Sequence, residues 1–389
     1  MSKLSNVMTG LSFGLVLILS QAGASDVLSS PEQTNNASGG LDYANAIPMD
    51  IRATFSEAAV QRVTEPVSFG EPGVSPGAKG NGEKLHEYLG EVGTVVSMQN
   101  VAVPSEHGTA NRPYATTRVD MFGQRLSRKF PNRITGKLFF KKGTDTYVCS
   151  ASSIKKGIVV TAAHCIYDNS ADKFYTEWEF IPAFYADSKV GLKAPYGKYK
   201  SLKAWVPSAY ANPTDNVVND YDVGVLVMKK RPNPDTGTNM YPGERTGFYG
   251  YGWNGWGYTN GLNDGSIGLI HQLGYPVSHD HGWQMQANDS QAEKVTVNLG
   301  SGNTAMAIMI GSRETGGSSG GPWLFNYGQI GALSGTSAGT YPNNDIVVAV
   351  TSWGWGSDDP KEQGATPFTD DNVKLVVDGA CSDTPDRCD

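Results

Sequence analysis

Short apolar runs separated by turn-forming residues dominate the chain from Gly136 onward. Clusters of Gly, Asn, Asp and Pro divide the runs, a pattern typical of short strands joined by turns. We therefore expect an all-β sandwich or barrel in this part of the chain. The runs are Lys137–Phe140, Tyr147–Ser150, Gly157–Thr161, Trp178–Ile181, Val223–Met228, Ile267–Leu273, Ala305–Ile310 and Ile346–Trp353.

The preceding residues, 25 to about 130, have little periodicity and are rich in Ser, Asn, Gly, Pro and Glu. Ser68–Gly82 resembles a linker, and a basic cluster follows at Arg125, Arg128, Lys129 and Arg133. Residues 25–133 are therefore predicted to form a pro-segment with a processing site, or an N-terminal extension that is never cut. The main domain is expected over 134–380, with a short tail over 381–389.

Residues 1–24 have the features of a secretory signal peptide. Lys3 precedes an apolar run from Leu11 to Leu19, and Ala22-Gly23-Ala24 forms an A-x-A cleavage site. The run is too short to span a bilayer comfortably, and no later segment reaches about 18 uninterrupted apolar residues. We expect a secreted protein without a membrane span after signal removal.

Composition narrows the function classes. Of the 389 residues, 39% are hydrophobic and 18% charged, which argues against wholesale disorder. A net charge of −7 without a basic stripe makes a nucleic-acid partner unexpected.

Export permits disulfides, and the chain has four cysteines. Three pairings are possible by counting, and proximity in the sequence favours Cys149–Cys165 and Cys381–Cys388. A zinc site is the alternative, but the chain has no C-x-x-C or H-x-x-x-H spacing to support it.

Gly317–Pro322 (GSSGGP) offers a candidate nucleophile, Ser319. A serine hydroxyl needs a neighbouring base and donors for the developing oxyanion. Glycine allows unusual backbone angles, so the N–H groups of Gly317 and Ser319 are candidate oxyanion donors. The same residues fit the G-x-S-x-G turn of α/β-hydrolases, but that fold needs a histidine after the serine, and all six histidines precede Ser319.

His164 is the candidate base, because Val159–Cys165 (VVTAAHC) places it after a β-rich run and beside Cys165, which can fix its loop. The chain order that remains open is His, Asp, Ser, so the carboxylate that orients His164 is expected between His164 and Ser319 in the chain. Asp220 and Asp222 are available, and Asp222 is favoured because it directly precedes the run Val223–Met228.

Thr351–Gly354 (TSWG) lies beyond the nucleophile. An extended strand with this sequence can pair with the main chain of a peptide substrate. Ser352 can also bond the acid of the triad, and Gly354 leaves room for a substrate side chain beside Trp353.

Taken together, TAAHC, DVGVLV, GSSGGP and SWG resemble the trypsin-like serine peptidases, and residues 134 to 356 resemble the secreted bacterial V8-like glutamyl endopeptidases. The resemblance rests also on Gly136–Phe140 before Cys149–Ser152, on Phe180–Ala183, on Gly274–Pro276 and on Thr315–Trp323. It implies two perpendicular six-stranded antiparallel β-barrels, with the active site between them and peptide hydrolysis through an acyl-enzyme.

Two features depart from animal trypsins. Ser318 stands where those enzymes have the aspartate that binds the new N-terminus on activation, so activation must work otherwise, for example by removal of a pro-segment that blocks the active site. Arg313 stands where trypsin has its pocket aspartate, and Glu314 follows it. Arg313 would attract an acidic substrate residue and Glu314 a basic one, or the two would pair with each other.

The sequence therefore predicts a secreted, monomeric serine endopeptidase that acts on proteins or peptides and needs no cofactor. A serine esterase and a catalytically silent binding protein on the same fold are the alternatives.

Overall fold

The computed structural model describes the chain over residues 26–34, 40–53, 55–63, 70–81, 106–108, 112–121, 125–187, 191–211, 220–234, 236–256, 266–328, 344–355 and 360–389. The predicted signal peptide lies outside these residues. Within them, no helix is both long and apolar enough to cross a membrane.

Six antiparallel strands close the first barrel, because β15 pairs with β16 as well as with β12. Aliphatic and aromatic side chains of these strands are buried together, which is why the apolar runs of the sequence fall in them. In order around the barrel, the strands are β15 (Tyr199–Pro207), β12 (Thr176–Pro182), β7 (Thr135–Lys142), β8 (Asp145–Ser153), β9 (Ile158–Thr161) and β16 (Gly224–Met228).

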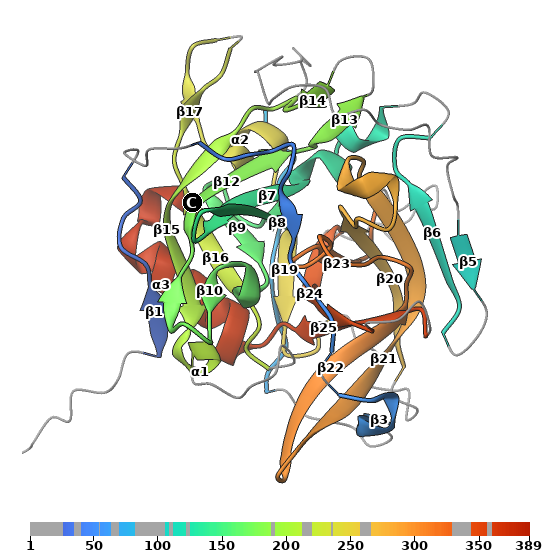
Figure 1. Ribbon diagram of the computed structural model, residues 1–389. Coiled ribbons are helices and arrows are strands. Elements are labelled where there is room, and N and C mark those ends of the chain that lie inside the picture. The colour runs from blue at the N-terminus through green and yellow to red at the C-terminus, as the bar shows by residue number, and fades with distance from the viewer. Residues whose placement is uncertain are drawn as a thin grey trace, which may run out of the picture.

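A second closed barrel follows in the chain, and here β20 pairs with β21 to complete the ring. Its antiparallel strands are β20 (Ser266–Gly274), β23 (Pro322–Phe325), β24 (Ile346–Gly354), β25 (Glu362–Pro367), β22 (Asn303–Gly311) and β21 (Gln286–Gly300). Figure 1 shows the two barrels side by side, the first in green and yellow and the second in orange and red. The predicted pair of six-stranded barrels is confirmed.

Strands from the N-terminal 120 residues add to both barrels. β1 (Val27–Ser29) pairs with β15 and β2 (Ile47–Pro48) with β8, whereas β3 (Val60–Arg62) and β6 (Tyr114–Arg118) pair with β21. β5 (Glu106–Gly108) extends the sheet beyond β6. The low-periodicity region is therefore built into the sheets of both barrels.

Part of the predicted linker Ser68–Gly82 is strand, and so is part of Phe248–Trp256, a stretch rich in aromatic residues and glycine. β4 (Gly73–Ser75) pairs with β19 (Gly250–Trp253), and β19 also pairs with β24. Tyr249 and Tyr251 are buried in the core. Glycines next to the rings let the backbones approach closely, and a propensity scale does not register this.

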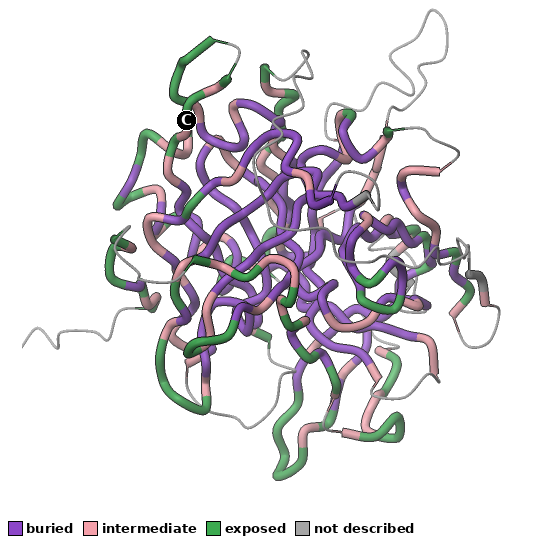
Figure 2. The backbone as a smooth tube through the Cα atoms, turned by 45° about the horizontal axis from the view of Figure 1, so that its top comes forward, coloured by how far each residue is buried: buried purple, intermediate pink, exposed green. Residues whose placement is uncertain are grey.

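The remaining elements are short. Three hairpins are β10 (Tyr167–Asp168) with β11 (Lys173–Phe174), β13 (Tyr185–Asp187) with β14 (Gly191–Lys193), and β17 (Arg231–Pro232) with β18 (Asn239–Met240). Among the described residues, the α-helices are α1 (Ser208–Ala211), α2 (Pro242–Thr246) and α3 (Leu375–Asp383). Figure 2 shows buried backbone running through the interior and exposed residues in the outer loops and hairpins.

The basic cluster before the first barrel is mostly packed into the protein. Arg133 is buried, and its guanidinium donates to the carbonyls of Thr246 and Lys79 at 2.8 Å each. The Arg128 guanidinium lies 3.8 Å from the centre of the Tyr185 ring. Arg125 and Lys129 alone are exposed in this cluster. A processing site here stays a prediction, and in this conformation the bond after Arg133 is shielded.

Candidate active site

A short helical turn at the end of β9 carries His164. The turn spans Ala163–Cys165 and follows a strand that is buried along its whole length. A disulfide joins Cys165 to Cys149 of β8, and both cysteines are fully buried. The small side chain of Ala163 is also fully buried, which allows the turn to pack tightly and fixes the imidazole.

Asp222 lies directly before β16 and holds the imidazole. Its Oδ1 accepts the His164 backbone N–H at 2.9 Å, and its Oδ2 lies 2.8 Å from His164 Nδ1. The Ser352 hydroxyl donates to the same Oδ2 at 2.5 Å. Asp220 instead accepts the backbone N–H of Met306 at 2.6 Å. The structure therefore places Asp222, and not Asp220, at His164.

The loop between β22 and β23 carries Ser319 and lies between the barrels. From the first barrel, the Ser150 N–H donates to the Ser319 carbonyl at 2.7 Å. Toward the second barrel, the Gly320 N–H donates to the Thr351 carbonyl at 2.8 Å. Gly320 has φ +76°, and a Cβ there would lie 1.9 Å from Thr161 Oγ1, so only glycine fits.

The reactive atoms of Ser319 and His164 are buried and not satisfied. Within the described residues, neither Ser319 Oγ nor His164 Nε2 has a hydrogen-bond partner. The backbone N–H groups of Gly317 and Ser319 likewise donate to no acceptor in the described part of the chain. Gly317 has φ +94°, and its carbonyl accepts the Ser150 hydroxyl at 2.9 Å. Buried polar groups without partners are uncommon, and a catalytic role is one of the reasons for which native proteins keep them.

The two residues expected to read a substrate side chain differ in environment. Glu314 is buried, both of its carboxylate oxygens lack a hydrogen bond, and burial raises its pKa well above the usual value. Its Oε2 lies against Gly274, where a Cβ would be 2.6 Å away. Arg313 is half-buried, and no ion pair between it and Glu314 forms among the described residues. Their mutual pairing, one of the three alternatives given above, does not form in the described part of the chain.

Two positioning residues were not found from the sequence. Ser150 bonds the nucleophile loop twice, as described above, and its hydroxyl also accepts the Tyr275 N–H at 3.0 Å. The buried Gln363 side chain donates to the Glu314 carbonyl at 2.9 Å and to the Ser318 hydroxyl at 3.0 Å. A single serine or glutamine in a strand gives no sequence signal of such a role. For Ser150, its place directly after Cys149 is the one available clue.

The cysteines are oxidised. Besides Cys149–Cys165, a disulfide joins Cys381 to Cys388 near the C-terminus, as expected. The His164 ring and the sulfurs of Cys149 and Cys165 come within 4.8 Å of one another. Sulfurs in a disulfide are not the thiolates that bind zinc, so this cluster does not fit a zinc site.

The comparisons with known proteins agree with this architecture. The sequence model of the family described as Trypsin matches residues 124–374, more than half of the chain. The chain belongs to the trypsin family. This confirms the resemblance to trypsin-like serine peptidases that the sequence motifs indicated.

Two curated relatives of this trypsin-family chain come from Bacillus. One is named extracellular metalloprotease (B. subtilis) and is 29% identical over 171 residues, covering 42% of the chain and 44% of the relative. The other, a glutamyl endopeptidase of B. licheniformis, is 28% identical over 151 residues, covering 39% of the chain and 40% of the relative. The chain spans less than half the length of each.

Solved structures are similar at lower identity. The protease Anisep of Arthrobacter nicotinovorans is 24% identical, with a TM-score of 0.44, over 64% of the chain and 94% of that structure. A Glu endopeptidase structure is 16% identical, with a TM-score of 0.45, over 68% of the chain and 95% of that structure.

Proposed function

We propose that this protein is a serine endopeptidase, with Ser319 as nucleophile, His164 as general base and Asp222 as the acid that orients the base. The observation that carries the proposal is the carboxylate of Asp222, which accepts bonds from both the backbone and the ring of His164. This arrangement selects the tautomer with the proton on Nδ1 and leaves the Nε2 lone pair available to take a proton.

In the proposed reaction, Ser319 Oγ attacks the scissile carbonyl carbon while His164 Nε2 removes the hydroxyl proton. The N–H groups of Gly317 and Ser319 then stabilise the negative oxygen, and each such donor contributes about 10²-fold to the rate or more. His164 returns the proton to the leaving amine, which breaks the peptide bond and leaves an acyl-enzyme. Water, activated by the same imidazole, hydrolyses the ester and releases Ser319.

Ser352–Gly354 at the end of β24 is the proposed partner for the substrate main chain, since an extended edge can bond a peptide in β fashion. Arg313 and Glu314 remain the candidates for reading a substrate side chain. Export through the predicted signal peptide is proposed as well, supported by the two disulfides and by the word extracellular in the name of the B. subtilis relative.

A peptide library tests the function. The matured protein is incubated with the library, with and without a serine-directed phosphonate, and the labelled residue is located by mass spectrometry. We expect cleavage, its loss on labelling of Ser319, and no cleavage by Ser319→Ala although its melting temperature is unchanged. An acidic preference at the cut would assign recognition to Arg313, and a basic preference to Glu314.

The two alternatives give other results in the same assay. Hydrolysis of simple esters but never of peptides indicates an esterase. Peptide binding without hydrolysis or phosphonate labelling indicates a silent binding protein, and peptide cleavage that survives Ser319→Ala refutes the assignment of the nucleophile.

A further inference from the structure

Residues 47–53 of the N-terminal region cross from one barrel to the other along the proposed active site. On the side of the first barrel, β2 runs parallel to β8, and the Met49 N–H donates to the Val148 carbonyl at 3.0 Å. The Met49 side chain is buried against the core that contains Cys149 and Cys165. In Figure 1 the blue chain near residue 50 passes along the junction of the two barrels.

On the side of the second barrel, the same segment bonds to Gly354. The Gly354 N–H donates to the Ile51 carbonyl at 2.7 Å, and the Ala53 N–H donates to the Gly354 carbonyl at 2.8 Å. These two bonds come from residues on either side of Arg52, which is the pattern of a parallel pair. Both main-chain groups that Gly354 has for a peptide substrate are therefore occupied.

Between these two attachments, the segment lies against the nucleophile loop. A Cβ built on Gly316 would lie 2.9 Å from the Met49 carbonyl oxygen, and one on Gly317 would lie 3.7 Å from Pro48 Cβ. Asp50 follows, and the guanidinium of Arg52 lowers its pKa, with a smaller contribution from the nearby His164. The segment thus passes over the loop that supplies the proposed oxyanion donors.

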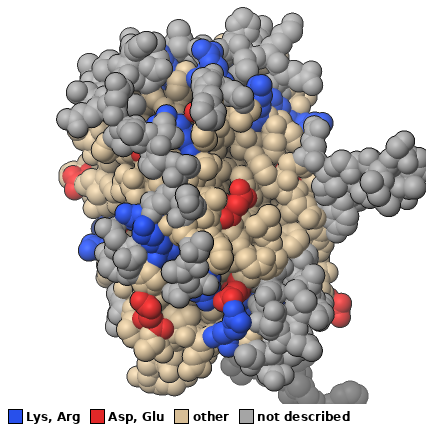
Figure 3. All heavy atoms as spheres, turned by 90° about the vertical axis from the view of Figure 1, so that its right-hand side faces the viewer, with Lys and Arg blue, Asp and Glu red and all other residues tan. Residues whose placement is uncertain are grey.

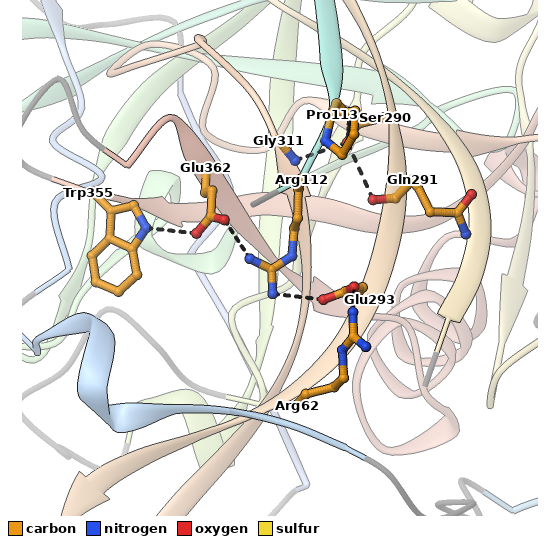
Figure 4. A network of polar contacts seen from close by, with 9 residues as sticks. All are labelled: Arg62, Arg112, Pro113, Ser290, Gln291, Glu293, Gly311, Trp355 and Glu362. Atoms are coloured by element: carbon orange, nitrogen blue, oxygen red, sulfur yellow. Dashed lines mark hydrogen bonds and ion pairs between the residues drawn. The ribbon is translucent and has the colours of Figure 1, made fainter. Parts of the chain in front are cut away.

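Aromatic packing holds the N-terminal chain in place just after the bonds that residues 51 and 53 make to Gly354. The Phe55 ring meets the Trp353 ring edge to face at 5.0 Å and the Trp355 ring at 5.6 Å. Edge-to-face ring pairs add attraction beyond that of the buried area. Figure 4 shows the next attachment, where Arg112 pairs with Glu293 at 2.9 Å and with Glu362 at 2.5 Å, and where Arg62 also pairs with Glu293.

We propose that residues 47–53 are an internal inhibitor, an extended strand that bonds to the main chain of Val148 and of Gly354 on either side of the nucleophile loop and keeps the intact chain latent. The proposal rests on the proposed function, and it explains why the reactive atoms of Ser319 and His164 are buried. Because the attachment uses main-chain bonds, displacement of the strand, rather than a change in the triad, exposes the site.

Ala53→Pro tests the proposal, because proline removes the N–H that bonds to Gly354 and is otherwise compatible with an extended chain. The matched control is Ala78→Pro, which removes a similar bond, 2.9 Å to the Phe248 carbonyl, in another part of the N-terminal region. The intact chain is treated with the serine-directed phosphonate. We expect Ala53→Pro to label Ser319 at least tenfold faster than wild type, and Ala78→Pro to label at the wild-type rate.

A second readout does not depend on catalysis. In a Ser319→Ala background, hydrogen exchange at the Gly354 amide is expected to accelerate in Ala53→Pro and not in Ala78→Pro. Equal exchange and equal labelling in all three chains would overturn the proposal, even if the matured protein cleaves peptides. Conversely, faster exchange in Ala53→Pro with no labelling of any chain would keep the bound strand and refute the serine peptidase function.

A synthetic peptide of residues 46–55 supplies a test in trans. It is expected to inhibit the matured protein competitively, while a scrambled peptide of the same composition does not. Failure of both peptides to inhibit at millimolar concentration would contradict the proposal.

Discussion

The substitution Asp222→Asn replaces a single oxygen of the proposed triad by an NH₂ group, and it gives the sharpest prediction about catalysis. The Asp222 carboxylate accepts three bonds, from the His164 N–H at 2.9 Å, from His164 Nδ1 at 2.8 Å and from the Ser352 hydroxyl at 2.5 Å. An asparagine can keep the first bond with its oxygen. Its NH₂ group then stands where Oδ2 was and donates to Nδ1, which must become the acceptor.

That exchange reverses the tautomer of His164. The ring proton moves to Nε2, so the base that should deprotonate Ser319 no longer has a lone pair facing it. We expect kcat to fall about 10⁴-fold at neutral pH. At about 1.36 kcal/mol for each factor of ten, the loss is about 5 kcal/mol of transition-state stabilisation.

The assay is kcat of the matured protein on a peptide substrate, corrected for the fraction of active sites by phosphonate titration. Asp220→Asn is the control, because Asp220 is two residues away, and an asparagine oxygen can still accept the Met306 N–H. Its kcat should stay within a factor of two of wild type. A kcat for Asp222→Asn within tenfold of wild type, or an equal loss in Asp220→Asn, would refute the reasoning.

Three further predictions concern stability, each measured by urea unfolding in a Ser319→Ala background. Gly320→Ala should lower the free energy of unfolding by about 3 kcal/mol, because a Cβ at φ +76° brings backbone strain and close contacts. Gly143→Ala, at φ +64° with no atom within 4 Å of the Cβ, should lower it by about 1 kcal/mol. Equal losses in the two variants would contradict this. Replacing both Cys149 and Cys165 by serine opens a link between residues 16 apart and should cost about 3 kcal/mol, and an unchanged unfolding free energy would argue against the cross-link. Burial lowers the pKa of Lys137 to about 7, so between pH 7 and 10 the unfolded chain holds a proton that the folded chain has lost, and the free energy of unfolding should rise with pH by about 4 kcal/mol. Lys137→Met should remove this rise, and a parallel pH dependence of the two proteins would show that Lys137 does not cause it.

Strands with an apolar run could be predicted from the sequence, and others could not. All eight predicted runs lie in barrel strands to within one residue at their ends, whereas β15, β21, β23 and β25 were missed. β21 shows the reason. Its buried residues include Gln286, Asn288 and Ser290, and hydrogen bonds to neighbouring segments satisfy Asn288 and Ser290. A hydropathy pattern cannot detect an inward face that is polar but satisfied.

The proposed triad could be predicted because each member lies in a short, unusual local sequence. The order of these residues in the chain also excludes the α/β-hydrolase fold. The proposed internal inhibitor could not be predicted from the sequence. Residues 47–53 bond through main-chain atoms, which every sequence has, and the bonds join positions about 100 and 300 residues apart. Pairing through backbone groups that every non-proline residue has leaves no side-chain pattern that identifies the two partners.

On the face in Figure 3, basic and acidic side chains of the described residues are interspersed, without a continuous stripe of one sign. The buried polar groups next to the nucleophile, such as Glu314, are the candidates that we propose for substrate selectivity.

The N-terminal region shares hydrogen-bonded edges with both barrels, through β1 and β2 on one and through β3 and β6 on the other. A cut in the backbone of this region would not by itself release the fragments, because each fragment would remain hydrogen-bonded to the edge of a sheet. A nicked protein should therefore migrate as one particle under native conditions and as several polypeptides once denatured. The rate of maturation would then be limited by dissociation of the strands. The protease that makes the cut would start the process without setting its rate.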